Sequence, residues 1–302
     1  MNSIDYSKIS IRRKIESAIS VFHVHRNEIF SNSKTAIMDF QHLRGYLDKY
    51  VCFPLKEIRI LEIGCGQTAI QTALFHTDGA NVIGIDIAVP TYRMSFSTFF
   101  RVLRLNGFGR AFKSLLRHIL FDKHYFSKIS QEYGKPINFD DIDIRIMDAT
   151  HMTFESESFD FIFSRAVLEH VKDVETLVRE INRILSTRGI AVINIHLFPS
   201  ISGGHRMEWR NPDRSPSIRI PPWDHLRNNR FPASTYLNKI TINEYRNLFH
   251  SYMNILEEHT LTEGEKLLTK DIEDELTGKG YTREDLLIST IIFCVKKKVV
   301  NQ

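Results

Sequence analysis

The sequence predicts an α/β fold: a doubly wound, seven-stranded, mostly parallel sheet whose last strand is antiparallel. Short apolar runs alternate with helical patterns along most of the chain, which is typical of a parallel sheet with helices on both faces. The first run ends in a glycine turn, and the second ends in Asp86, twenty residues after Gly66. This order is typical of a nucleotide-type pocket at the carboxyl ends of parallel strands.

Seven segments have the length and apolar character of strands. They lie near residues 58–63, 81–86, 142–147, 159–164, 189–196, 254–260 and 288–296. The clearest helix is 174–185, because its apolar side chains share one face, and another is expected at 241–253. Three lysines follow the last strand, which predicts an antiparallel strand at the edge of the sheet. Residues 10–50 show helical spacing and predict two helices within an N-terminal segment, 1–50.

Composition excludes several classes of protein. The chain has 302 residues and a net charge of +4, which is too small to indicate a partner by itself. Cys52, Cys65 and Cys294 form no CxxC pair, so neither a disulfide framework nor a cysteine zinc site is predicted. We expect a reducing, cytoplasmic location. No run approaches the ~18 apolar residues of a spanning helix, so membrane contact would be peripheral, at the inner face.

The glycine turn defines the cofactor pocket. Gly64 and Gly66 allow a tight turn, Glu62 is placed to meet an ammonium group, and Asp86 is placed to bind ribose hydroxyls. The same turn satisfies the dinucleotide pattern GxGxxA. Glu62, however, has the wrong charge to face a pyrophosphate, which argues against a nicotinamide cofactor. Asp160, at the start of the fourth strand, is assigned a structural role.

With its neighbours, the turn resembles a class I S-adenosylmethionine-dependent methyltransferase of the broad small-molecule subgroup. The resemblance covers about residues 55–200. The residues that carry it are Glu62-x-Gly64-x-Gly66, Asp86, Asp148-Ala149, Phe159-Asp160, Leu168-Glu169-His170-Val171 and Arg188-Gly189. It implies one methyltransferase domain over residues 1–302, with S-adenosylmethionine as the cofactor.

The resemblance also implies where the cofactor binds. The implied contacts are Glu62, Gly64, Cys65 and Gly66 at the methionine and ribose, Asp86 at the ribose, Ile87, Asp148 and Ala149 at the adenine, and Ser164 and Arg165 after the fourth strand. Thr68 departs from the family's third glycine. It stands where the next helix begins, and we expect its hydroxyl to cap that helix.

Two spacings are too long for simple connections. The first predicts a basic, aromatic insertion at 91–140. Its segment 91–128 holds eight Lys and Arg residues against one acid, Asp122, with a third of the chain's phenylalanines. Such a segment can lie at a membrane surface or hold an anionic lipid-linked substrate. The alternative is an extra helical layer with a phenylalanine core. A nucleic-acid partner is not expected.

The second spacing predicts a substrate lid at 197–238, with six arginines, no lysine and both tryptophans. Arginine recognises phosphates and carboxylates, and tryptophan faces suit sugar rings. The expected acceptor contacts are Arg206, Trp209, Arg210, Trp223 and Arg227. The alternative is an ordered surface loop anchored by its tryptophans. Pro221-Pro222-Trp223 is similar to the tetrapeptide of nucleic-acid amino-methyltransferases, but it does not follow the fourth strand, so that function is excluded.

A hydroxyl acceptor needs a base within hydrogen-bond reach. The best placed candidates are His196, at the end of the fifth strand, and His205, in the lid; His225, beside Asp224, is a third. The spacing of His196, His205 and Glu208 matches no metal site, so none is predicted.

The predicted function is methyl transfer to a hydroxyl of a polar acceptor, such as a sugar of a cell-surface glycan or lipid-linked intermediate. Two alternatives remain at this stage. One is a nicotinamide-dependent reductase or epimerase, disfavoured by Glu62. The other is a catalytically silent membrane- or partner-binding module of the same fold.

Overall fold

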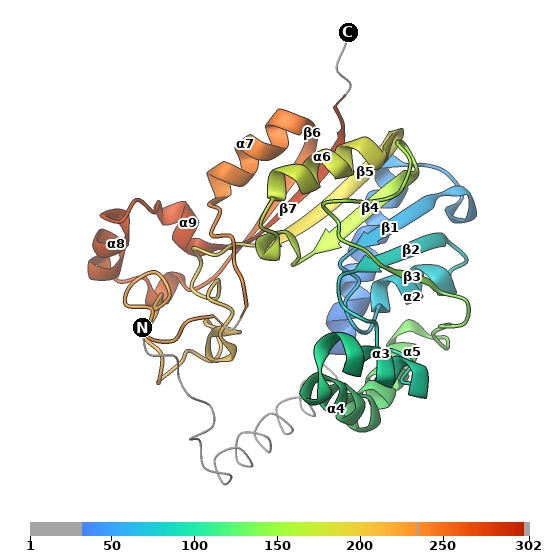
Figure 1. Cartoon of the computed structure of the whole chain (residues 1–302). Helices are drawn as coiled ribbons and strands as arrows, with labels where there is room; N and C mark the ends of the chain where they lie inside the picture. Colours follow the sequence, from blue (N-terminus) through green and yellow to red (C-terminus); the bar gives the residue numbers. More distant parts are fainter. Residues whose placement is uncertain (1–31, 234, 299–302) are drawn as a thin grey trace.

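A seven-stranded sheet forms the centre of the computed structural model, which describes residues 32–233 and 235–298 (Figure 1). In space the strands follow the order β3-β2-β1-β4-β5-β7-β6. Their bounds are β1 Arg59–Ile63, β2 Asn81–Asp86, β3 Asp143–Ile146, β4 Phe159–Arg165, β5 Leu185–His196, β6 Met253–Thr262 and β7 Ile288–Lys297. Strands β1 to β5 pair in parallel, whereas β7 is antiparallel to both β5 and β6. The predicted fold class is confirmed.

The position predicted for the last strand is wrong. β7 is antiparallel, as expected, but it lies between β5 and β6, and β6 forms the edge. Lys297, expected to protect an edge, instead donates from Nζ to the carbonyls of Asn182, Arg183 and Leu185 at 3.0–3.2 Å. These carbonyls lie at the end of a helix, where backbone acceptors lack helical partners. The lysine therefore stabilises a helix end.

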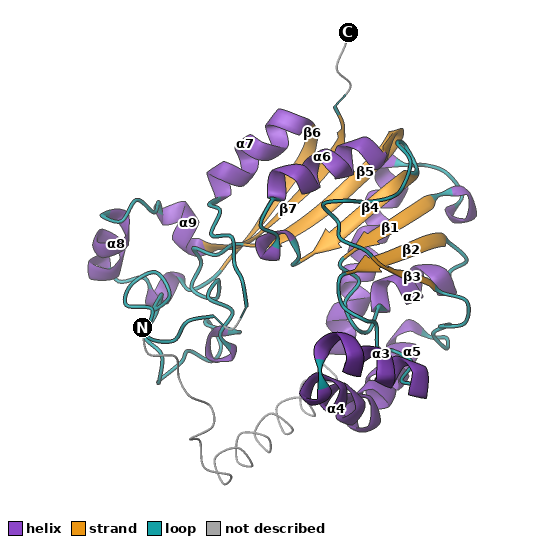
Figure 2. Ribbon diagram, viewed as in Figure 1, coloured by secondary structure: helices purple, strands orange, loops and turns teal. Residues whose placement is uncertain are grey.

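Helices cover both faces of the sheet (Figure 2). α6 (Val174–Ile184) and α7 (Ile242–Tyr252) share one apolar core with the strands. The helix of residues 32–50 and α2 (Ile70–Thr77) share the core on the other face. The predicted helices 174–185 and 241–253 are confirmed. Residues 10–31 of the predicted N-terminal helices lie outside the described residues.

Asp160 has the structural role assigned to it. Its fully buried carboxylate accepts hydrogen bonds from the guanidinium groups of Arg59 and Arg188 at 2.9–3.3 Å and from Ser186 at 2.9 Å. These partners outweigh burial and hold the pKa of Asp160 well below its usual range. A Cβ at Gly189 would lie 2.6 Å from the Asp160 carbonyl oxygen, so only glycine fits there.

The two insertions lie on opposite sides of the sheet's carboxyl end (Figure 1). The first forms α3 (Phe96–Asn106), α4 (Phe108–Arg117), a π-helical turn η3 (His118–Asp122) and α5 (Lys123–Tyr133). The second, the lid, is mostly irregular and packs on α8 (Lys270–Thr277) and α9 (Arg283–Leu287). Within 32–233 and 235–298, no helix has the length and apolar character needed to cross a membrane.

Candidate functional site

The glycine turn after β1 is held tightly between two neighbours. Gly64 and Gly66 have φ angles of +76° and +66°, a region that favours glycine. The N–H groups of Gly64 and Cys65 donate to the Ile85 carbonyl of β2 at 2.8 and 3.0 Å. A Cβ at Gly64 would lie 2.1 Å from Val167 Cγ2. Gly64 therefore also lets the turn pack against the loop that follows β4.

Cys65 and Thr68 complete the glycine turn, and the cofactor contact of Cys65 stays a prediction. Cys65 is buried and lies close to Gly84. A Cβ at Gly84 would lie 2.7 Å from Thr72 Oγ1 and 3.1 Å from Cys65 Cβ, so only glycine fits there. The helix cap predicted for Thr68 is wrong: α2 begins at Ile70 after the N-cap Ala69, whose φ is +46°, and no side chain caps it. Thr68 lines a cavity instead. The left-handed Ala69 turns the chain before a threonine hydroxyl can reach the helix N–H groups.

Glu62 lies at the floor of this cavity. Its Oε2 accepts hydrogen bonds from the N–H of Thr72, at 2.8 Å, and from the Thr72 hydroxyl. Burial raises the pKa of Glu62 to about 7, although the Thr72 bonds lower it. Among the described residues no hydrogen bond reaches Oε1, and Glu62 lines the cavity. A ligand ammonium there would stabilise the carboxylate, which fits the role that the resemblance implies.

The adenosine side of the pocket lies at the carboxyl ends of β2 and β3. Asp86 accepts from the N–H of Gly66 at 2.8 Å and from that of Ala88 at 2.7 Å, and each oxygen keeps a further lone pair. The side chain of Ile87 is 78% exposed. Asp148 is exposed, and hydrogen bonds from Thr150 lower its pKa. Because β2 and β3 are neighbours, these residues and Ala149 share one edge; their contacts with the cofactor stay predictions.

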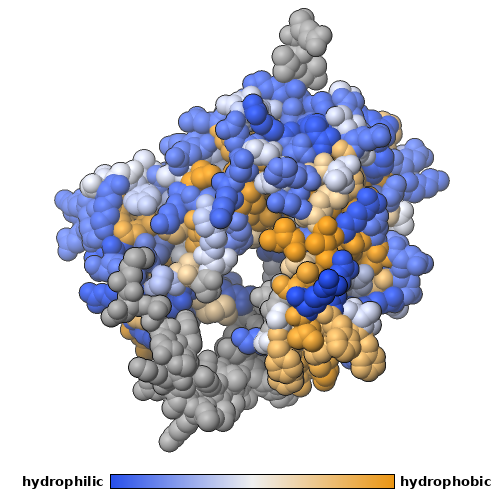
Figure 3. Space-filling view, in the orientation of Figure 1, coloured by the Kyte–Doolittle hydropathy of each residue, from blue (hydrophilic) through white to orange (hydrophobic). Residues whose placement is uncertain are grey.

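A cavity of about 670 Å³ lies at the carboxyl ends of β1 and β4. Of the predicted cofactor residues, it is lined by Glu62, Gly64, Ser164 and Arg165. The Ser164 hydroxyl is buried without a hydrogen-bond partner among the described residues. An unpaired buried hydroxyl is costly, so the cavity is suited to a polar ligand. Between the lid and the helical insertion, the surface is hollowed (Figure 3).

Most of the cavity's remaining wall was not identified from the sequence. These residues include Asp39, His42, Tyr46, Arg117, Tyr125 and Asn194. Asn194 could have been found, because it lies two residues before His196 on the same face of β5. The others come from the helix of residues 32–50 and from the helical insertion, which are distant in sequence from the glycine turn. No local pattern connects them to it.

Two ion pairs between an arginine and an aspartate form part of the cavity wall. Arg117 donates to Thr91 at 2.8 Å and to Gln67 of the glycine turn, and its Nε lies 3.2 Å from a carboxylate oxygen of the buried Asp122. Arg165 pairs with Asp39 of the 32–50 helix. Burial raises the pKa of Asp39, and Arg165 opposes this effect. Both insertion and N-terminal helix therefore help to close the pocket.

The lid brings His205 to the end of the sheet, near His196 and His170. The ring centroids of His196 and His205 are 4.9 Å apart, and those of His170 and His205 are 5.0 Å apart. Burial lowers the pKa of both His196 and His205 to about 4, so both are neutral at pH 7. Beside them lies Glu169, which is 1% exposed. In the sequence, Glu169 and His170 were recognised only as part of a motif that resembles a family.

A hydrogen-bond chain fixes the protonation of His196. Glu263 accepts from both the N–H and the hydroxyl of Ser202. The Ser202 oxygen must then accept from His196 Nε2, which lies 2.8 Å away. This arrangement places the proton of the neutral imidazole on Nε2 and leaves a lone pair on Nδ1. His196 can therefore act as a proton acceptor.

His225 packs against the turn of the lid that carries His205. Its Nε2 lies 2.9 Å from the carbonyl oxygen of Phe198, to which it donates. A Cβ at Gly204 would lie 2.8 Å from His225 Cγ, so the ring fixes the turn that carries His205. Burial lowers the pKa of His225 to about 4. The catalytic role of His225 stays a prediction, and its position favours a supporting one.

The predicted acceptor contacts separate into two groups. Trp209 and Trp223 are 3% and 0% exposed within the lid's own core, so neither ring presents a face to solvent and their positions do not support acceptor contact. Arg227 pairs with Glu275 of α8 at 2.7 Å. Arg206 donates to the carbonyl of Pro232 at 3.3 Å. Of the five, Arg210 lines the cavity, where it also donates to Asn32.

The helical insertion leaves a large apolar surface uncovered (Figure 3). We call this surface the helical patch. Its members are Phe96, Phe100, Leu105, Phe108, Phe112, Leu116, Ile119 and Leu120, all of them 40–88% exposed. Only a small core lies beneath, formed by Val89, Val102 and Ala111. The expected alternative, a layer whose phenylalanines form its core, is therefore not what the insertion has.

The sheet order, the glycine turn and the cavity agree with the fold and pocket predicted from the sequence. Residues 106–193 match the family model described as a methyltransferase domain. This match begins beyond the glycine turn, so Glu62, Gly64 and Asp86 are assigned by their geometry. This match supports the predicted class, an S-adenosylmethionine-dependent methyltransferase, and with it S-adenosylmethionine as the cofactor. The nicotinamide alternative is set aside.

Among curated proteins, the chain is similar to parts of two fungal synthetases. It is 25% identical over 206 residues to the PKS-NRPS hybrid synthetase cheA of Chaetomium globosum, covering 60% of the chain and 4% of that protein. It is 23% identical over 216 residues to the hybrid PKS-NRPS synthetase LUC5 of a Fusarium species, covering 68% and 5%. The chain thus spans about a twentieth of the length of these relatives.

Solved structures with a similar fold include a geranyl diphosphate methyltransferase in complex with S-adenosylmethionine. It is 13% identical, with a TM-score of 0.45, and the alignment covers 86% of this chain and 85% of that one. A protein from Listeria monocytogenes, described as a candidate S-adenosylmethionine-dependent methyltransferase, is 12% identical with a TM-score of 0.47. That alignment covers 88% of this chain and 99% of the other.

Proposed function

We propose that the chain transfers a methyl group from S-adenosylmethionine to a hydroxyl of a polar, anionic acceptor, a sugar of a cell-surface glycan or lipid-linked intermediate. The observation that carries this proposal is the polar cavity. It begins at Glu62 and Gly64 of the cofactor turn. It is lined further on by Arg210 and by two ion pairs, Arg117 with Asp122 and Arg165 with Asp39. Arginine forks suit the planar oxygens of phosphates and carboxylates.

The chain's own residues provide alignment and a base. When bound, S-adenosylmethionine supplies a methyl group that is attached to a sulfonium sulfur. Glu62 would hold the ammonium end, and the glycine turn would fix the donor against the loop after β4, which places donor and acceptor in line. His196 would take the hydroxyl proton on Nδ1 while the oxygen–carbon bond forms and the sulfur–carbon bond breaks. Its neutral state at pH 7 and its proximity to Asn194 of the cavity support this role.

Binding tests the cofactor pocket. Isothermal titration with S-adenosylhomocysteine should find one site per chain, and Asp86→Ala should weaken it about tenfold or more, since a ribose contact is lost. Asp271→Ala, on the exposed surface of α8, is the matched control and should bind as the wild type does. Equal affinity in both variants would remove Asp86 from the pocket.

Turnover tests the acceptor. Methyl-labelled S-adenosylmethionine is incubated with sugar phosphates, nucleoside-diphosphate sugars and neutral glycosides, and the product is examined by NMR for a methyl ether. His196→Gln should lower kcat about 100-fold and leave S-adenosylhomocysteine affinity unchanged. Methylation at nitrogen or carbon would contradict the hydroxyl assignment. Intact cofactor binding without transfer to any acceptor would favour the catalytically silent module.

The lipid part of the proposal rests on the helical patch. Its side chains are apolar and exposed, and residues 87–121 contain no Asp or Glu but six Lys and Arg. This combination suits an anionic membrane surface, where aromatic rings enter the headgroup region and basic side chains meet lipid phosphates. Docking there would bring the adjoining cavity to a lipid-linked acceptor.

Liposome flotation tests this docking. The wild type should float with vesicles that contain phosphatidylserine, and much less with phosphatidylcholine alone. The double variant Phe108→Ser/Phe112→Ser should lose at least about half of the floated fraction, since the two stacked rings are removed. Ile218→Ser, which removes a fully exposed apolar side chain of the lid, is the control. Equal flotation of all three proteins would overturn membrane docking.

A further inference from the structure

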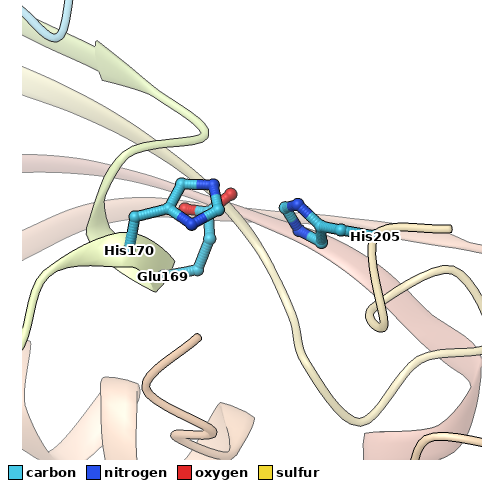
Figure 4. Close-up of side chains that lie close together, drawn as sticks. All are labelled: Glu169, His170 and His205. Atoms are coloured by element: carbon cyan, nitrogen blue, oxygen red, sulfur yellow. The ribbon is translucent and has the colours of Figure 1, made fainter. Parts of the chain in front are cut away.

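We propose that Glu169, His170 and His205 bind one divalent transition-metal ion that ties the lid to the sheet. The three side chains each offer one ligand atom, and these atoms lie within 4.8 Å of one another. Glu169 and His170 follow β4, whereas His205 belongs to the lid, and their side chains point toward one another (Figure 4). Two histidines and a carboxylate form a common ligand set for zinc and ferrous iron.

The lack of hydrogen bonds at the ligand atoms supports a bound cation at this place. Both carboxylate oxygens of Glu169, and Nε2 of His205, are buried without a hydrogen-bond partner of normal geometry among the described residues. Near the Glu169 carboxylate, the backbone N–H groups of Glu169 and His196 interact with it only weakly. A buried carboxylate so poorly paired is costly, and a bound cation would offset the cost. Three orphaned atoms in one place are therefore stronger evidence than any one of them.

The surrounding residues orient the ligands. Nδ1 of His170 lies 2.9 Å from the Tyr236 carbonyl oxygen, so it carries the proton and leaves the lone pair on Nε2 for a metal. This is the outer-shell contact that metal-binding histidines usually make. Asn238 donates its backbone N–H to the Glu169 carbonyl at 2.9 Å and holds that turn in place.

The backbone of the lid is strained at His205. The φ of His205 is +52°, a strained value for a residue with a side chain. Gly203 and Gly204 come directly before His205. A Cβ at Gly203 would lie 2.1 Å from the Phe198 carbonyl oxygen, and Gly204 packs on His225. Ligand atoms at about 2.1 Å from one tetrahedral ion lie about 3.4 Å apart. The three ligand atoms, which lie within 4.8 Å of one another, would therefore move closer by up to about 1.4 Å on binding. Water would complete the coordination.

Cobalt titration tests the proposal. Chain stripped with EDTA and dialysed is titrated with Co²⁺, followed by visible absorption, and then with Zn²⁺ in competition. We expect one ion per chain by elemental analysis. Glu169→Gln and His205→Gln should each weaken binding at least about 100-fold, whereas His151→Gln, on the exposed surface, should not. Circular dichroism and S-adenosylhomocysteine affinity check that each variant is folded, independently of any acceptor.

Proteolysis tests the tie. With Zn²⁺ bound, cleavage within 200–240 should be about tenfold slower in the wild type, and unchanged by Zn²⁺ in Glu169→Gln. Absence of a stoichiometric ion in the wild type would overturn the site. So would wild-type affinity in Glu169→Gln, which would assign the ion to other ligands. An ion bound without protection of the lid would overturn the tie.

Discussion

The two insertions share a composition rich in arginine and aromatic residues, but their aromatic side chains have opposite environments. In the helical insertion, Phe96 and Phe108 are 88% and 69% exposed. In the lid, Trp209 and Trp223 are 3% and 0% exposed. The difference comes from partners: the lid packs on α8 and α9 in a third core, whereas the helical patch has no partner within the described residues. Composition offered burial and exposure as alternatives for each insertion and could not decide between them.

The contrast teaches that each insertion serves the site differently. The lid is a small packed unit that carries His205 to the sheet, so its rigidity matters. The helical insertion contributes Arg117 to the cavity and keeps an apolar surface uncovered. Apolar patches of this kind usually mark an interaction surface. The following changes are chosen to separate the two regions.

The largest effect is expected from removing a lid anchor. Trp223→Ala should lower the free energy of unfolding by about 4 kcal/mol, because it empties a large volume in the lid core. Phe108→Ala, in the helical patch, should change it by less than about 0.5 kcal/mol. Urea unfolding followed by circular dichroism compares the two. Similar losses for both variants would mean that the patch is packed as the lid is.

Glycines of the two insertions should respond with opposite signs. Gly203→Ala should destabilise by about 3 kcal/mol, because its Cβ would lie 2.1 Å from the Phe198 carbonyl oxygen. Gly109→Ala, in α4, meets nothing within 4 Å and should stabilise by about 0.5 kcal/mol. Differential scanning fluorimetry gives both signs. A neutral Gly203→Ala would show that the turn carrying His205 can relax.

A buried acid at the lid contact makes stability depend on pH. Burial raises the pKa of Glu169 from 4.5 to about 7, so the folded state holds this proton more tightly than the unfolded chain. The group's contribution to stability therefore falls as pH rises from 4.5 to 7. In EDTA, the free energy of unfolding of Glu169→Gln should rise by about 2 kcal/mol relative to that of the wild type between pH 4.5 and pH 8. An unchanged difference across this range would contradict the burial of an unpaired carboxylate.

Much of the fold could be predicted from the sequence, because periodicity and turn chemistry are local. The bounds of β2 were predicted at 81–86, and the capped helix α6 was recognised from its apolar face. The position of β7 could not be predicted from such local patterns, because an antiparallel apolar strand fits the edge and the interior of a sheet equally well. Its pairing with β6 was decided by the core.

The site shows the same division. By itself, the sequence determined the glycine turn and the spacing of the carboxylates Glu62 and Asp86, since these lie within one strand-turn-helix-strand segment; the class of cofactor was inferred from this turn together with the later motifs. Only the tertiary structure placed Arg117 and Asp39 in the cavity, buried the tryptophans, and brought Glu169 to His205, 36 residues away. The physical reason is that these contacts depend on packing between elements that are distant in the chain, and such packing leaves no periodic mark in the residues themselves.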